Sequence, residues 1–274
     1  NDSAYELSVT ATDDVGNSNT QTVTVNLNDV NEAPSLDTNS TVTVDEGAAG
    51  NSIGNGSLNA SDPEGDTLTY NVTSAVGNGT LFVDANTDGV LDSGEEVSTG
   101  SFTQANIDNG NLLYNHDGSA TTSDSFDFDL GDGNGHTVAG NTFNISVTAA
   151  PTVASINRSS PSSPTNVDSV TYTVTFSESV SGIDTGDFTT TQASGDVSGS
   201  VSSVGSSSGS SVDVTVGSIT GDGDLRLDVN DDDSITNGNG VALGGVGTSG
   251  GTGDGSYTSG ETYVLDNTGP TFSA

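Results

Sequence analysis

The densest set of potential metal ligands lies between residues 84 and 95. Oxygen-bearing side chains alternate with other residues at the start of this stretch, a glycine follows them, and a glutamate closes it. In the pattern D-x-[DN]-x-[DN]-G-x5-E, loop positions 1, 3, 5, 7, 9 and 12 supply oxygen ligands to calcium. The residues at those positions are Asp84, Asn86, Asp88, Val90 through its carbonyl, Asp92 directly or through water, and Glu95, with Gly89 at the sharp turn. The stretch therefore predicts a calcium site.

This stretch is expected to form an EF-hand-type loop between two β-strands. Leu81-Phe-Val precedes it and Val97 follows it, and such residues are typical of strands rather than of the helices that flank other loops of this kind. The alternative is an acidic hairpin that binds no ion.

A second group of acidic residues lies around a proline at position 34 and in a later turn. The two runs are Asn28-Asp29-Val-Asn31-Glu32-Ala-Pro34 and Asp62-Pro-Glu64-Gly-Asp66. The first resembles the linker motif D-x-N-D-N-x-P of the cadherin family, with Glu32 in place of the second Asp. The second resembles the family's D-x-D motif, with Glu64 in place of its second Asp. In cadherins these groups bind calcium between successive modules and stiffen the rod. The resemblance implies ligands at Asp29, Asn31, Glu32, Asp62 and Glu64.

The resemblance to cadherins extends to three further acidic residues. Asp132, in Leu-Gly-Asp-Gly-Asn, matches the family's late Asp and is implied to face the same junction. Asp13 is its counterpart before the junction and would serve a junction upstream. Glu46, in Val-Asp-Glu-Gly, resembles the early Glu that reaches toward the following junction. That junction is Ala149-Ala-Pro-Thr, which has no acidic residue, so Glu46 is either a ligand or a surface residue.

The charge of the chain excludes some functions and favours calcium. Its 274 residues include 38 Asp and Glu against two Arg and no Lys, and the formal net charge is −36 at pH 7. Without a basic patch the chain cannot neutralise phosphates, which excludes nucleic-acid binding and disfavours binding to anionic lipid. Thirty Asp against eight Glu favour tight oxygen-ligand loops. Several bound calcium ions would offset the repulsion among the carboxylates.

Other features of the composition narrow the class further. Cysteine is absent, which excludes disulfides, zinc–thiolate sites and thiol nucleophiles. No run approaches 18 apolar residues, so no membrane-spanning segment is predicted. A hydrophobic content of 30% with high net charge is also typical of disorder, and we expect a chain that folds with calcium and loosens without it. The start at Asn1 without a signal peptide leads us to expect a mature segment or a piece of a longer chain.

Short alternating segments rich in Val, Ile, Thr, Phe and Tyr predict β-strands throughout. The fold class is all-β, as tandem antiparallel β-sandwich modules of cadherin-like or immunoglobulin-like type. Prolines after strands give an N-terminal piece (1–35, the end of a cadherin-like module), a central module (36–150), a C-terminal module (151–268) and a tail or start of a further module (269–274). Two strands bury no core alone, so upstream sequence or another chain must complete the N-terminal piece. The Ser/Gly-rich stretch 198–211 is expected to be a loop or a frayed edge hairpin.

Both modules show further resemblances. Leu113-Tyr-Asn-His116-Asp-Gly and Asp124-Ser-Phe-Asp-Phe resemble the chondroitin sulfate proteoglycan repeat, which is itself cadherin-like. The run from Val174 to Phe188 resembles the bacterial immunoglobulin-like repeats of giant surface proteins, including the large RTX-type adhesins. Neither His116 nor His136 has a partner Ser or Cys arrangement, so no catalytic triad is predicted.

These resemblances imply a structural, non-catalytic segment of a calcium-stabilised extracellular bacterial surface protein, either an adhesin stalk or a filament. Its partners would be neighbouring modules of the same or identical chains, with glycans bound through other parts, and without nucleic acid or membrane insertion. One alternative is a filament subunit that polymerises by strand complementation through the N-terminal piece. Another is a halophilic surface-layer-type protein, whose stability would follow bulk salt rather than calcium. A tip domain that binds sugar or ice would need an aromatic pocket or a Thr-x-Thr ladder, and neither stands out in the sequence.

Overall fold

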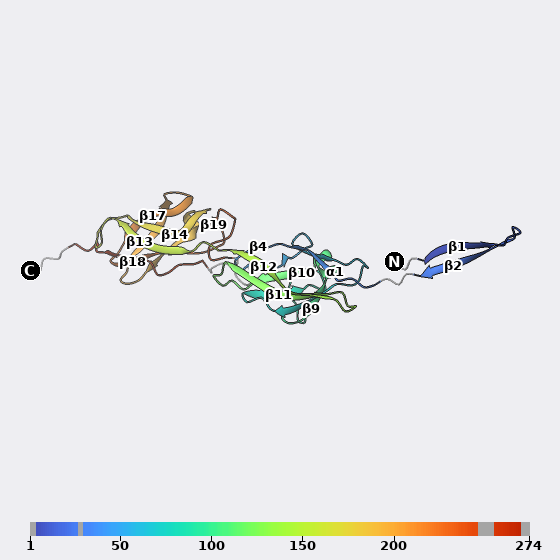
Figure 1. Ribbon diagram of the computed structural model, residues 1–274. Helices are drawn as coiled ribbons and strands as arrows, with labels where there is room; N and C mark the ends of the chain where they lie inside the picture. The colour runs from blue at the N-terminus through green and yellow to red at the C-terminus, as the bar shows by residue number, and fades with distance from the viewer. Residues whose placement is uncertain (1–3, 27–29, 246–254, 270–274) are drawn as a thin grey trace, which may run out of the picture.

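The computed structural model describes residues 4–26, 30–245 and 255–269, and strands dominate these ranges. A two-stranded hairpin, a central module and a C-terminal module follow one another along an elongated molecule (Figure 1). Each module has its own cluster of buried hydrophobic residues. The predicted all-β fold class of sandwich modules is therefore confirmed. Among the described helices, none has the length and apolar character needed to cross a membrane.

The N-terminal hairpin consists of β1 (Ala4–Thr12) and β2 (Ser18–Asn26), and all of its strand residues are exposed. Its antiparallel register places Tyr5 opposite Val25 and Leu7 opposite Val23. Because side chains alternate across a strand, these four residues share one face of the hairpin. Tyr5 is 62% exposed and Leu7 is 59% exposed. Within the described residues, this apolar face is not covered by another strand.

Deleting residues 1–26 should leave the thermal unfolding of the two modules unchanged when calcium is chelated. The hairpin strands bury no side chain, so their removal costs neither module any core packing. Differential scanning calorimetry of the full chain and the truncated chain in EDTA measures the effect. A lower midpoint for the truncated chain would show that the hairpin does support the central module.

The central module places a five-stranded sheet, ordered β4-β12-β11-β7-β9, beside smaller sheets ordered β5-β10-β8 and β3-β6. Strand β4 runs parallel to β12, whereas the other paired strands in these sheets are antiparallel. The elements are β3 (Ser35–Asn39), β4 (Val42–Asp45), β5 (Asn51–Ser52), β6 (Leu58–Ser61), β7 (Thr69–Ser74), β8 (Gly79–Val83), β9 (Ser101–Thr103), α1 (Gln104–Asp108), β10 (Leu112–His116), β11 (Ser123–Gly131) and β12 (Thr137–Thr148).

Aromatic side chains fill the core of the central module. Along β11, Phe126, Phe128 and Leu130 are buried at alternate positions, as a strand with one face on a core requires. The ring of Tyr70 on β7 stacks on Phe102, with centroids 4.9 Å apart, and lies 5.3 Å from the ring of Phe128. This packing joins β7, β9 and β11, and the turns that precede β7 and follow β11 carry acidic residues described below.

The C-terminal module is a second sandwich. One sheet has the order β13-β14-β17-β16, with β19 paired to β14, and the other has the order β15-β18-β20. The elements are β13 (Val153–Ser160), β14 (Val170–Ser181), the 3-10 helix η1 (Thr185–Asp187), β15 (Phe188–Gln192), β16 (Ser198–Val204), β17 (Ser208–Thr220), β18 (Gly223–Val229), β19 (Thr236–Asn237) and β20 (Thr262–Leu265).

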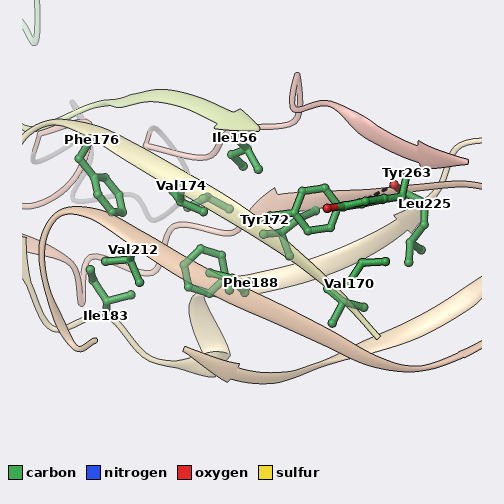
Figure 2. Close-up of a cluster of buried hydrophobic side chains, with 14 of the residues drawn as sticks. Ile156, Val170, Tyr172, Val174, Phe176, Ile183, Phe188, Val212, Leu225 and Tyr263 are labelled. Atoms are coloured by element: carbon green, nitrogen blue, oxygen red, sulfur yellow. Dashed lines mark hydrogen bonds between the residues drawn. The ribbon is translucent and has the colours of Figure 1, made fainter. Parts of the chain in front are cut away.

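Two tyrosines connect the sheets of this module (Figure 2). The rings of Tyr172 and Tyr263 meet edge to face, with centroids 5.1 Å apart. The Tyr172 hydroxyl donates to the carbonyl of Leu225 at 2.5 Å, and the Tyr263 hydroxyl donates to the carbonyl of Thr171 at 2.8 Å. Both buried hydroxyls are therefore paired across the sandwich, which avoids the cost of an unsatisfied polar group.

Candidate metal centres

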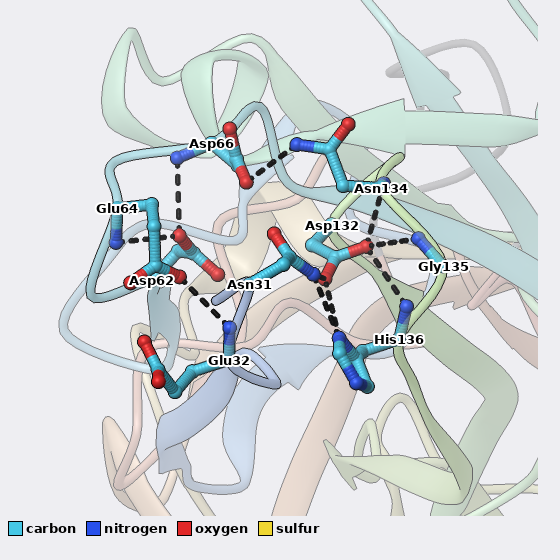
Figure 3. Close-up of polar contacts among 9 residues, drawn as sticks. All are labelled: Asn31, Glu32, Asp62, Glu64, Asp66, Asp132, Asn134, Gly135 and His136. Carbon is cyan, nitrogen blue, oxygen red and sulfur yellow. Dashed lines mark hydrogen bonds and ion pairs between the residues drawn. The ribbon is translucent and has the colours of Figure 1, made fainter. Parts of the chain in front are cut away.

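Three carboxylates meet in the turn between β6 and β7. One oxygen from each of Asp62, Glu64 and Asp66 lies within 4.8 Å of the others. The Asp62 Oδ1 atom accepts the backbone N–H groups of Glu64, at 2.9 Å, and Asp66, at 3.2 Å, so this aspartate also shapes the turn that collects the acids. We name this group the boundary site, because residues 30–34 run beside it (Figure 3).

The second oxygen of Asp62 shows that the boundary site fits a cation. Asp62 Oδ2 is buried and has no hydrogen-bond partner. A buried carboxylate oxygen without a partner is costly, and neighbouring like charges raise that cost. A hard divalent cation removes both penalties, and calcium prefers ligand sets made of oxygen atoms. Asp62, Glu64 and Asp66 would supply the carboxylates of such a site.

The segment that enters the central module is attached to the same place. The Glu32 N–H donates to Glu64 Oε2 at 3.1 Å. The Asn31 side-chain amide donates to Asp132 Oδ2 at 2.7 Å and lies 2.7 Å from Nδ1 of His136. Residues more than 100 positions apart thus meet at one end of the module, as Figure 3 shows.

Asp132 is a buried carboxylate at the end of β11. Its Oδ1 atom accepts three backbone N–H groups, from Asn134 at 2.7 Å, Gly135 at 3.0 Å and His136 at 3.1 Å. Burial by itself raises the pKa of Asp132, but the hydrogen bonds from Asn31 and from these amides outweigh burial and lower it to about 2. The group therefore stays ionised at neutral pH, as a structural anchor or a metal ligand must.

The Asp132 carboxylate should contribute stability that disappears in acid. A lowered pKa means that the contribution is complete above the unfolded value of about 4 and is lost as the pH falls through about 2. In EDTA, we expect the native chain to melt at a higher temperature than the Asp132→Asn variant near neutral pH. The difference between the two midpoints should shrink below about pH 4. Calorimetry across this range measures it. A constant difference over the whole range would contradict the assignment.

The loop at 84–95 follows β8 and is held by its own acidic residues. Asp84 is 4% exposed; its Oδ1 accepts the N–H of Thr87 at 2.7 Å, and its Oδ2 accepts that of Gly89 at 2.8 Å. Glu95 closes the loop, because its two oxygens accept the N–H groups of Ala85, at 2.8 Å, and Asp92, at 2.9 Å. Gly89 has φ of +79°, the left-handed conformation that favours glycine. The first and last predicted ligands are thus placed at the two ends of one closed loop.

Inside this loop an amide separates the other carboxylates. The Asn86 side-chain N–H₂ donates to Asp88 Oδ2 and Asp92 Oδ2, at 3.0 Å each. Binding a cation there requires Asn86 to present its oxygen instead. Over the described ranges, a set of three carboxylates within 4.8 Å of one another occurs at the boundary site and not in this loop. The Val90 side chain is 60% exposed and carries no oxygen, so this residue can offer a cation only its backbone carbonyl. Calcium binding at 84–95 stays a prediction.

The remaining predicted ligands lie elsewhere. Asp13 is in the turn between β1 and β2, where its carboxylate accepts the N–H groups of Val15, at 3.1 Å, and Asn17, at 2.8 Å. The hydrogen bond from the Asn17 side chain, followed by these backbone bonds, lowers the pKa of Asp13. Glu46 lies at the other end of the central module, next to Ala150. Asp29 lies outside the described residues.

The sequence did not single out three residues at this end of the module as ligands or anchors. Asp66 is itself a member of the boundary site, Asn134 donates its side-chain amide to Asp66 Oδ2 at 2.7 Å, and His136 lies beside Asn31 and Asp132. The sequence could have indicated Asp66, because this residue stands in the same acidic run as Asp62 and Glu64. No local pattern indicates Asn134 or His136, because the fold of β11 and β12 brings them there.

Comparison with known families identifies one part of the chain. Residues 34–147 match the model of the family described as Cadherin-like. This range corresponds to the central module and confirms its predicted resemblance to cadherins. No curated protein matches the sequence.

Two solved structures show a distant likeness. The crystal structure of Dpr2 Ig1-Ig2 in complex with DIP-Theta Ig1-Ig3 matches with a TM-score of 0.27 and 12% identity, over 80% of this chain and 65% of that chain. The structure of surface layer protein SbsC, domains 4–9, matches with a TM-score of 0.22 and 17% identity, over 77% of this chain and 31% of that chain. This chain therefore spans less than two thirds of either one, and both TM-scores are too low to define a common arrangement of modules.

Proposed function

We propose that the chain is a structural, non-catalytic segment of an extracellular surface protein, an adhesin stalk or a filament, whose modules are stabilised by calcium. The observation that carries this proposal is the boundary site, where three carboxylates and an unpaired buried oxygen of Asp62 lie against the entering segment. The cadherin-like match of residues 34–147 supports an extracellular structural role.

The proposed mechanism is mechanical. A cation at the boundary site would bind acids of the turn 62–66, which already holds the entering segment through the bond from Glu32 N–H to Glu64. It would thereby restrict rotation of that segment relative to the central module. Because binding to the folded arrangement alone stabilises it, the stiffness of the boundary depends on the ion concentration. The partners are neighbouring modules of the same or identical chains.

Hydrogen exchange of the entering segment tests this function. We expect the amides of residues 30–36 to exchange more slowly in calcium than in EDTA, and Asp62→Asn to remove the difference. Asp168→Asn is the matched control, because it removes one exposed carboxylate from the C-terminal module. Exchange in residues 30–36 that does not respond to calcium would contradict the proposed role.

A second candidate function rests on the apolar face of the N-terminal hairpin. Tyr5, Leu7, Val23 and Val25 are exposed on one face, and a strand pair from another chain could cover them. The chain would then be a self-assembling filament subunit. Sedimentation at increasing concentration distinguishes the candidates, since polymerisation that Leu7→Ser abolishes would favour the filament.

A further inference from the structure

The junction between the central and C-terminal modules is built differently from the boundary site. The linker begins at Ala149, and both Ala150 and Pro151 are buried. Glu46 from the end of β4 is 8% exposed, and its Oε2 atom accepts the N–H of Ala150 at 3.0 Å. The Glu46 N–H in turn donates to the carbonyl of Thr148 at 3.0 Å. The side chain and the main chain of Glu46 therefore hold the same short stretch.

The C-terminal module holds the linker from the other side. The Asn237 side-chain amide donates to the Ala149 carbonyl at 3.3 Å, and the Gly244 N–H donates to the Pro151 carbonyl at 2.9 Å. A Cβ atom on Gly245 would lie 3.2 Å from the Glu46 carbonyl oxygen and 3.6 Å from Ala150 Cβ. The two modules thus meet through direct contact around the linker.

The turn that carries Glu46 is itself braced. The Gly47 and Gly118 N–H groups both donate to Nδ1 of the buried His116, at 3.0 and 3.1 Å. Since Nδ1 accepts these bonds, the proton of the neutral ring sits on Nε2, which is 3.0 Å from the Thr121 hydroxyl. This arrangement fixes the position from which Glu46 reaches the linker.

We propose that Glu46 is a positioning residue that clamps the Ala149–Pro151 linker, and that this second junction is held by direct contacts without a metal ion. A carboxylate that accepts a buried N–H forms a strong, charge-assisted hydrogen bond. The linker residues Ala149, Ala150 and Pro151 bring no side-chain oxygen. Glu46 and Glu178 lie at the junction, but over the described residues no set of three carboxylates like that of the boundary site occurs there. The stiffness of the molecule therefore depends on an ion at the boundary site but not at the second junction.

Distances between spin labels test both halves of this proposal. The native chain has no Cys, so two introduced cysteines are labelled uniquely. Ser123→Cys and Ser210→Cys place labels on exposed positions of the two modules. We expect pulsed electron resonance to give one narrow distance distribution, equally narrow in EDTA and in excess calcium. A distribution that is narrow in calcium and broad in EDTA would overturn the proposal.

Two substitutions at Glu46 separate a clamp from a calcium ligand. Glu46→Ala should broaden the distribution with and without calcium. Glu46→Gln should keep it narrow, because an amide oxygen still accepts the Ala150 N–H while binding calcium more weakly. If the Gln variant broadens as the Ala variant does, or if the Ala variant stays narrow, the clamp is wrong. A label pair at Ser8 and Ser123 reports on the boundary site separately. If that distance does not respond to calcium, the proposed function is contradicted, but the result for Glu46 can still be interpreted.

Discussion

Replacing Asp84 and Glu95 together by Ala should remove the part of the calcium-dependent stability of the central module that a site in the loop 84–95 contributes. A site saturated at 100 to 1,000 times its Kd contributes about 3–4 kcal/mol to the free energy of unfolding. For a module of this size that corresponds to a fall in the melting midpoint of roughly 10 °C or more. The two residues are the ends of the loop, and each holds it closed through backbone N–H groups.

The calcium-dependent part of this effect is isolated by repeating the melt in EDTA. Loss of the hydrogen bonds of Asp84 and Glu95 lowers the midpoint in both conditions, whereas loss of a bound ion lowers it only in calcium. The difference between the two conditions is therefore the quantity to compare with the native chain and with Asp168→Asn. An unchanged difference in the double variant would show that residues 84–95 form an acidic hairpin without an ion.

Replacing Phe128 by Ala should destabilise the central module by about 3–5 kcal/mol, the usual cost of truncating a buried aromatic residue. The side chain is fully buried, and its ring centroid lies 5.3 Å from that of Tyr70 and 5.9 Å from that of Phe126. Little rearrangement can fill the resulting cavity, because rigid rings surround it. Calorimetry, or thermal unfolding followed by circular dichroism, measures the shift in the unfolding midpoint.

This substitution also tests the division into modules. The buried clusters of the central and C-terminal modules share no residue, so we expect two unfolding transitions, of which Phe128→Ala moves the one for the central module. Val264→Ala is the control, since that side chain is 42% exposed and should cost little. An equal fall of both transitions would show that the two modules unfold as a single unit.

Much of the fold could be predicted because burial alternates along the strands. Phe126, Phe128 and Leu130 show the pattern in the central module, and Val170, Tyr172 and Val174 show it in the C-terminal module. The Ser/Gly-rich stretch 198–211 has no such alternation, and we expected a loop or an edge hairpin there. The structure has the hairpin, formed by β16 at the sheet edge and the start of β17, because backbone pairing needs no apolar side chains. Helix α1 has five residues, too few to show a helical period; a capping box between Thr103 and Asn106 starts it.

Candidate ligands could be selected where acidic residues stand close together in the sequence. Asp62 and Glu64 belong to one turn, and Asp84 to Glu95 belong to one loop, so spacing or resemblance was enough to select them. Contacts between distant segments could not be predicted in this way. Asn134 reaches Asp66, and His136 reaches Asp132, only because the turn between β11 and β12 lies beside the turn 62–66. The role of Glu46 at the second junction depends equally on where the C-terminal module packs.

Thermal unfolding of the full chain in EDTA, in excess calcium and in molar NaCl without calcium tests the central claim most directly. If calcium binds specific carboxylates, calcium alone should raise the midpoint of the central module, and NaCl should raise it far less because it only screens the repulsion among 38 acidic residues. Asp62→Asn should then reduce the gain. Equal stabilisation by NaCl and calcium would contradict the claim and favour a halophilic surface protein.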